Sequence, residues 1–170
     1  MAARTDLEHK AAAPACVACY VITVSDTRTE ATDTGGRAMI ELLTAAGHTV
    51  TGRTIVKDDA DLLRDCIGRQ LANPAVQAII TTGGTGISAR DCTYEAVTAM
   101  LWKRLDGFGE LFRMLSYQQI GSAAMLSRAV AGTIAGRVVV SLPGSEGAVR
   151  LALEKLLLPE LGHLVREASR

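Results

Sequence analysis

Four short polar or glycine-rich segments carry the residues of this chain that could do chemistry. They are TVSDT at residues 23–27, KDD at 57–59, TGGTG at 82–86 and PGS at 143–145. Each follows a segment that predicts a β-strand. Consecutive glycines after a strand let backbone N–H groups face a concavity that suits phosphate. We therefore expect a phosphate-binding cradle formed by Gly83, Gly84, Thr85 and Gly86.

The glycine run does not match the better known phosphate motifs. It lacks the spacing and the lysine of a Walker A loop, and it does not follow the dinucleotide pattern GxGxxG. A tight strand-to-helix turn without any ligand is the alternative interpretation. Two threonines before the glycines and one among them favour a binding site.

Two carboxylates accompany this cradle, Asp91 shortly after the glycines and Asp58 at the end of another strand. Either could be structural, because Asp91 could bond amides of the next helix and Asp58 could cap the helix that begins near Ala60. Two carboxylates facing a phosphate would repel it unless a cation intervened. Mg²⁺ bound by carboxylates and substrate phosphates is the usual solution, so the residues predict a magnesium nucleotide or a related polyphosphate.

Other residues give weaker signals. An arginine beside a serine, as at Ser127 and Arg128, could clamp a phosphate or could simply be helix surface. The CVAC run at 16–19 enters a strand, whereas a reactive cysteine pair normally lies at a helix N-terminus. The three histidines have no ligand spacing. We therefore assign no redox or metal role to the cysteines and histidines.

The elements that must position these segments alternate between strand and helix. Strands are expected at residues 16–24, 49–56, 76–82 and 137–142, each followed by apolar residues at helical spacing. Four such units predict a three-layer α/β domain with a doubly wound, mostly parallel sheet and right-handed crossovers. The carboxyl ends of parallel strands share one edge, so the four polar segments should gather there.

Residues 104–136 interrupt this alternation. Phe108, Leu111, Phe112 and Leu115 form a stripe typical of an amphipathic helix, which either covers the sheet or meets a neighbouring subunit. At the other end of the chain, residues 1–15 are expected to be a loose arm. Residues 16–170 should then form a single domain.

Composition limits the classes of partner. The 170 residues carry 18 Lys and Arg against 18 Asp and Glu. The sequence therefore predicts no broad cationic surface of the kind that binds nucleic acid or anionic lipid. No run reaches the roughly 18 apolar residues that span a membrane. Four cysteines without paired metal spacing favour a reducing compartment. We expect a cytoplasmic protein with neither a nucleic-acid nor a membrane partner.

Four motifs in order resemble those of the MoaB/MogA family of molybdenum cofactor biosynthesis proteins. They are TVSDT (23–27), TGGTG with RDCT (82–86 and 90–93), LSRAVAG (126–132) and LPGS (142–145). The resemblance runs from about residue 17 to residue 168. It implies the family's α/β fold, assembled as a homotrimer or hexamer. It also implies a nucleotidyltransferase, molybdopterin adenylyltransferase, which uses Mg-ATP to place AMP on the terminal phosphate of molybdopterin and releases pyrophosphate.

The resemblance also assigns roles to single residues. Asp58 and Asp91 would be the acidic residues that hold Mg²⁺ and are needed for adenylyl transfer. The residues that would hold the molybdopterin phosphate are Gly83, Gly84, Thr85, Gly86 and Ser127. The residues that would lie toward the nucleotide are Ser25, Asp26, Gly144 and Ser145. The enzyme that inserts molybdate is a candidate protein partner.

The sequence departs from the family pattern at two positions, where Lys57 and Tyr94 replace residues that are commonly proline. It keeps Asp58, which some inactive paralogues replace. A non-catalytic paralogue that binds a pterin, a nucleotide or a protein partner is the alternative hypothesis. A different phosphate-binding α/β enzyme, such as a sugar-phosphate isomerase, is a third.

Overall fold

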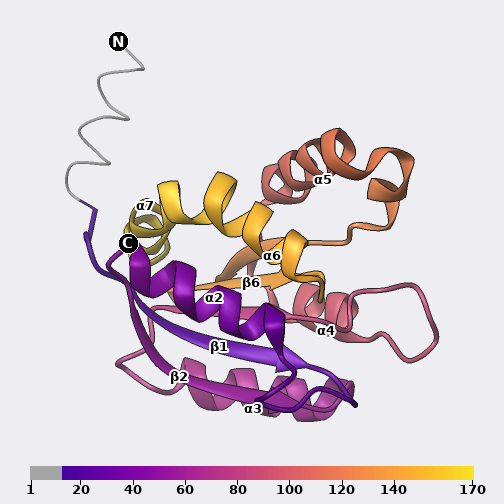
Figure 1. The fold of residues 1–170 in the computed structure, drawn as a ribbon. Coiled ribbons are helices and arrows are strands. Elements are labelled where there is room, and N and C mark those ends of the chain that lie inside the picture. Colours follow the sequence, from indigo (N-terminus) through magenta and orange to yellow (C-terminus); the bar gives the residue numbers. More distant parts are fainter. Residues whose placement is uncertain (1–12) are drawn as a thin grey trace.

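The computed structural model describes residues 13–170 as one six-stranded sheet between two layers of helices (Figure 1). The elements, in chain order, are β1 (Ala18–Val24), α2 (Thr34–Ala45), β2 (Thr49–Val56), α3 (Ala60–Leu71), β3 (Ala78–Thr82), α4 (Thr93–Met100), β4 (Lys103–Arg104), α5 (Asp106–Ile120), the 3₁₀ helix η1 (Gly121–Leu126), β5 (Val130–Ile134), β6 (Arg137–Leu142), α6 (Glu146–Ala152), the π-helical stretch η2 (Leu153–Leu157) and α7 (Leu158–Ala168). The alternation of strand and helix predicted from the sequence is confirmed.

The sheet has the order β2-β1-β3-β6-β5-β4, and β1, β2, β3 and β6 run parallel. From β1 the chain crosses to β2 on one side and then returns to β3 on the other side of β1. The direction of winding therefore reverses between β1 and β3. In open α/β sheets, ligands bind outside the carboxyl ends of the strands at this switch point.

The hairpin formed by β5 and β6 was not predicted. Ser127 and Arg128, which the sequence left either as helix surface or as a phosphate clamp, lie between η1 and β5, and β5 pairs with β6 in antiparallel register. Ala135 and Gly136 join the two strands with φ of 49° and 76°. Two successive left-handed residues match the right-handed twist of the flanking strands. The small residues of β5 hide the alternation that marks a strand.

Alternate residues of each central strand face the two helix layers. In β1, Cys19 and Val21 belong to the core that α2, α5, α6 and α7 complete. Ile22 and Val24 belong to the opposite core, which α3 and α4 complete. A strand buried on both faces reads as a continuous apolar run, which explains why the sequence identifies these strands so readily.

Helix α5 shows that the predicted amphipathic stripe covers the sheet. Phe112 is fully buried, Phe108 and Leu115 pack against the same core, and the two phenyl rings stack 6.5 Å apart. Leu111 is 47% exposed and lies at the edge of this face, where it lines a groove with Phe108. Met114, Tyr117 and Ile120 are also exposed, and we call these three residues of α5 the outer row.

Most of the predicted N-terminal arm, residues 1–12, lies outside the described residues. Pro14 lies against α7, since a Cβ on Gly162 would overlap its carbonyl oxygen. None of the helices within residues 13–170 has the length and apolar character that crossing a membrane requires.

Candidate functional site

The glycine run after β3 lies between the ends of β1 and β6. The Gly83 N–H donates to the carbonyl of Leu142 at 3.1 Å, and a Cβ on Gly83 would overlap the carbonyl oxygen of Val24. A Cβ on Gly144 would lie 3.1 Å from the Gly83 Cα. Gly83 also has a φ of 95°, which L side chains rarely adopt. Only glycine fits here, so three of the four polar segments meet at the switch point.

The two predicted acids flank this glycine run. A Cβ on Gly84 would lie 2.8 Å from Asp58 Oδ1, and a Cβ on Gly86 would lie 2.6 Å from Asp91 Oδ2. Residues two apart along an extended chain are separated by at most about 7 Å. The structure therefore brings carboxylates from two separate crossover units to neighbouring positions of one loop.

Asp58 does not cap the following helix. Asp59 does so, because its Oδ1 accepts from the N–H groups of Asp61 and Leu62, both at 2.9 Å. The Oδ1 of Asp58 accepts instead from Cys92, from the backbone N–H at 3.3 Å and from Sγ at 3.2 Å. Among the described residues, none donates a hydrogen bond to its Oδ2. That oxygen is available for a ligand.

Asp91 is held by the turn that precedes it. Its Oδ2 accepts from the Ser88 N–H at 2.9 Å and from the Ser88 hydroxyl at 2.6 Å. The hydroxyl contact is the largest cause that holds the pKa of Asp91 below its ordinary value. Helix α4 begins at Thr93 after Cys92, with no side-chain cap. The cap interpretation of Asp91 is therefore wrong. Because its pKa is lowered, the carboxylate is ionised at neutral pH.

Thr93 belongs to this site although the sequence analysis did not assign it there. Its side chain is fully buried, and its hydroxyl has no hydrogen-bond partner within the described part of the chain. The same hydroxyl lies where a Cβ on Gly84 would stand, beside Asp58. A buried hydroxyl without a partner is costly, and a bound anion would satisfy it. The RDCT motif contains this threonine, but only the fold shows where it points.

The β1 loop joins the site through Asp26. Its Oδ1 accepts from the Asp58 N–H at 3.3 Å, and its Oδ2 forms an ion pair with Arg90. Ser25 stays within its own turn, where its hydroxyl accepts from the N–H groups of Thr27 and Arg28. Of the two predicted nucleotide-side residues of β1, only Asp26 contacts Asp58, and it links the loops of three strands.

Ser127 and Ser145 line one cavity of about 290 Å³. Pro143, Gln119 and Leu151 form other parts of its wall. The Ser145 hydroxyl accepts from the Ala148 N–H at 3.3 Å and so caps α6. Because Gly144 packs on the glycine run, this cavity adjoins the cradle. It has the size of a small organic group rather than of a single ion.

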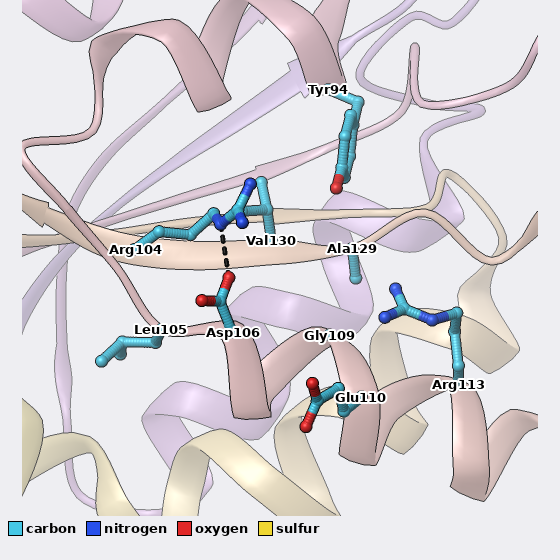
Figure 2. A pocket seen from close by; sticks show the side chains of 9 residues that line it. All are labelled: Tyr94, Arg104, Leu105, Asp106, Gly109, Glu110, Arg113, Ala129 and Val130. Carbon is cyan, nitrogen blue, oxygen red and sulfur yellow. Dashed lines mark hydrogen bonds and ion pairs between the residues drawn. The ribbon is translucent and has the colours of Figure 1, made fainter.

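A second polar cavity of similar volume lies between α4, β4 and α5 (Figure 2). Two arginines and two acids line it, Arg104 and Arg113 with Asp106 and Glu110. Figure 2 shows Arg104 paired with Asp106 and the Tyr94 hydroxyl directed into the cavity. The formal charges cancel, so a polyanion finds no excess of positive charge there. The features that suit phosphate lie at the glycine run.

The residues at the glycine run fit a magnesium ion. Within residues 13–170, no group of three or more His, Cys, Asp or Glu side chains could hold a metal by itself. Mg²⁺ does not require such a cage, because it is usually bound by one or two carboxylates, waters and substrate phosphates. Asp58 and Asp91 supply hard oxygen ligands. Burial, reinforced by Asp58, raises the pKa of Cys92 to about 11, and Mg²⁺ prefers oxygen ligands to sulfur.

Comparisons with known proteins agree with this arrangement. Residues 20–163 match the family described as "Probable molybdopterin binding domain". The chain is 56% identical over 164 residues to Molybdenum cofactor biosynthesis protein B of Bacillus anthracis, covering 96% of this chain and 97% of that protein. The Bacillus subtilis protein of the same name is 53% identical over 164 residues, with 96% of each chain covered.

Two solved structures extend the comparison to the fold. A crystal structure of Molybdenum cofactor biosynthesis protein B has a TM-score of 0.89 and 55% identity, covering 92% of this chain and 98% of that one. The crystal structure of the tungsten cofactor synthesizing protein MoaB from Pyrococcus furiosus has a TM-score of 0.83 and 38% identity, covering 93% of this chain and all of that one. With its three-layer fold and its glycine run at the switch point, the chain belongs to the MoaB/MogA family of molybdopterin-binding domains.

Proposed function

We propose that this protein is a molybdopterin adenylyltransferase of molybdenum cofactor biosynthesis. The relatives named Molybdenum cofactor biosynthesis protein B support the pathway. The observation that carries the reaction is the position of Asp58 and Asp91, which lie against Gly84 and Gly86 of one glycine run. Two carboxylates beside a phosphate cradle suit chemistry that joins two polyanions around a divalent cation.

The reaction balances without a side-chain nucleophile. An oxygen of the terminal phosphate of molybdopterin attacks the α-phosphorus of ATP. The bond from that phosphorus to the bridging oxygen of the β-phosphate breaks, and pyrophosphate leaves. The protein has to hold the attacking oxygen in line with the leaving oxygen and to neutralise the developing charge.

The chain supplies these functions from separate strands. The backbone of residues 83–86 would bind the molybdopterin phosphate, and the buried Thr93 hydroxyl would donate to it. Asp58 and Asp91 would hold Mg²⁺, which when bound neutralises charge on the departing pyrophosphate. Asp26 and Ser25 would face the nucleotide from the β1 loop.

The cavity that contains Ser127 and Ser145 is proposed to receive the organic part of one substrate. It adjoins the cradle through the contact of Gly144 with Gly83. A planar ring bound there would place its phosphate near the glycine run. Binding energy from the ring would then serve to orient the reacting phosphate.

Purified protein mixed with molybdopterin, ATP and Mg²⁺ should form adenylylated molybdopterin and pyrophosphate in equal amounts. Asp58→Ala and Asp91→Ala should each lower kcat by about 10²-fold or more, because electrostatic stabilisation of the transferred phosphate is lost. Asp61→Ala is the matched control, since Asp61 lies on the exposed surface of α3 and, among the described residues, its carboxylate pairs only with Arg64. Its kcat should stay unchanged.

Other outcomes would identify other functions. Binding of molybdopterin or ATP without product would favour a non-catalytic paralogue. Turnover of a sugar phosphate without ATP would favour an isomerase. Either result would reject the proposed transferase.

We further propose that the chain forms a homo-oligomer through the outer row of α5. Exposed apolar side chains are common singly, but a row of them on one helix indicates a contact surface. Met125 and Leu126 of η1 continue this surface, at 74% and 54% exposure.

The free thiols of the described cysteines also fit the reducing cytoplasm expected from the sequence.

A further inference from the structure

Arg128 directs its whole guanidinium group at the protein. Its Nε donates to the carbonyl of Thr85 at 2.8 Å, and one terminal nitrogen donates to the carbonyl of Gly86 at 2.6 Å. Both terminal nitrogens also contact the Glu95 carboxylate, at 2.6 and 3.2 Å. Every nitrogen of the fork is therefore engaged. To gain a bidentate contact with this arginine, a phosphate would have to displace Glu95 or the glycine run.

Two features of α4 keep the guanidinium in place. Hydrogen bonding from Arg128 lowers the pKa of Glu95, so the carboxylate is ionised and the pair is charged at neutral pH. The guanidinium carbon also lies 4.7 Å from the centre of the Tyr94 ring. A stacked and bidentate arginine has a defined orientation that a lysine could not reproduce.

Because the peptide group is planar, the hydrogen bond from Arg128 to the Thr85 carbonyl also fixes the direction of the Gly86 N–H. In a trans peptide the C=O of one residue and the N–H of the next point in opposite directions. Because Arg128 holds the Thr85 carbonyl, the Gly86 N–H must point to the far side. Asp91 lies on that side, where a Cβ on Gly86 would be 2.6 Å from its Oδ2. The Gly86 N–H is also among the donors that hold the pKa of Asp91 low.

We propose that Arg128 is a positioning residue that fixes the Thr85–Gly86 peptide and, through it, the Asp91 carboxylate. The proposal rests on the proposed function, in which Asp91 holds the metal beside the phosphates. The hydrogen bond from Arg128 to the Gly86 carbonyl fixes the direction of the Ile87 N–H in the same way. Arg128 thus acts on the reaction without touching either substrate.

Arg128→Lys keeps the charge but loses the fork, and Arg128→Gln loses both. Each should lower kcat on the order of 10²-fold, as expected for a misplaced reacting group, while KM for ATP and molybdopterin changes less than about threefold. In ¹H–¹⁵N spectra of the free full-length protein, the amide resonances of Gly86 and Ile87 should shift. Arg150→Lys is the matched control, since Arg150 pairs with Glu146 on α6, and it should change none of these.

A second variant keeps the test informative if the arginine variants do not fold. Glu95→Gln removes only the exposed counterion of Arg128 and should shift the Gly86 resonance in the same direction by a smaller amount. Combining Arg128→Lys with Asp91→Asn should cost no more kcat than Asp91→Asn alone, since both changes act on one group.

Three results would overturn the proposal. They are an unshifted Gly86 resonance, a raised KM with unchanged kcat, which indicates a direct phosphate clamp, and full additivity with Asp91→Asn. Failure of the proposed function is distinguishable, because the wild-type protein would then show no transfer. In that case the amide spectra would still decide whether Arg128 fixes the loop.

Discussion

At the scale of single residues, the site depends on the different roles of two adjacent carboxylates, Asp58 and Asp59. Asp58 and Asp59 have the same chemistry, but only Asp59 bonds the first turn of α3. Asp58 is turned to the glycine run and contacts Cys92. The sequence predicted Asp58 at the site and left the cap as an alternative, and the capping bonds of its neighbour remove that alternative.

Asp33 is the residue whose loss should damage the fold most without touching the candidate ligands. It is 2% exposed, accepts from the Thr23 hydroxyl at 2.7 Å and from Arg53 at 2.9 Å, and caps α2 through the Gly36 N–H. Asp33→Ala leaves Arg53 partly buried without its partner, so the free energy of unfolding should fall by about 3 kcal/mol.

Urea unfolding measures this difference directly, with Asp61→Ala as the control. Asp61 forms an exposed pair with Arg64, and its loss should cost less than about 1 kcal/mol. Equal losses for the two variants would show that the Asp33 network does not stabilise the fold.

The sequence predicts the role of a residue well where both its type and its place after a strand point to that role. It predicts poorly where the role depends on the direction of the side chain. Asp91 and the glycines follow strands and carry recognisable chemistry. Thr93 and Arg128 have ordinary types at ordinary positions. Their roles depend on an unpartnered hydroxyl and on two carbonyl contacts, which only the fold reveals.

At the scale of elements, α5 has two apolar faces with different purposes. Phe108 and Phe112 pack on the sheet, whereas the outer row faces solvent. The stripe predicted from the sequence comprises the sheet-facing residues and Leu111 at their edge, and it does not include the outer row. Periodicity gives the apolar arc of a helix but not the number of surfaces that the arc meets.

We expect the outer row to hold the proposed homo-oligomer together. A Met114→Glu and Tyr117→Glu double variant places two charges in this surface and should convert the assembly to monomers, as measured by light scattering coupled to size-exclusion chromatography. Leu62→Glu is the control, because Leu62 is a comparably exposed apolar residue on α3. A wild-type monomer, or an assembly that survives the double variant, would contradict the assignment.

The central strands were predictable because they are apolar and buried on both faces. The edge strand β2 has no fully buried residue and was predictable from its β-branched residues. β2 and β6 have the bounds expected from the sequence, and β1 and β3 begin two residues later than expected. β4 and β5 were missed because one is only two residues long and the other contains Gly132. That glycine allows the close approach of β4, since a Cβ there would overlap the carbonyl of Lys103.

At the scale of the whole molecule, topology makes the site. β1 and β3 are neighbours although β2 lies between them in the chain, so their loops meet where the winding reverses. The contacts of Gly83 with the ends of β1 and β6 close this meeting point. Residues distant in sequence, Asp58 and Asp91, thereby reach one loop. The gathering of polar segments at one edge was predictable, but the contacts among them were not.

We propose that these two carboxylates together bind one divalent ion and a polyphosphate. Mn²⁺ can replace Mg²⁺ and be followed by electron paramagnetic resonance in the presence of a non-hydrolysable ATP analogue. Asp58→Asn and Asp91→Asn should each weaken Mn²⁺ binding by about tenfold or more, whereas Asp61→Asn should not. Unchanged Mn²⁺ affinity in both site variants would contradict this proposal.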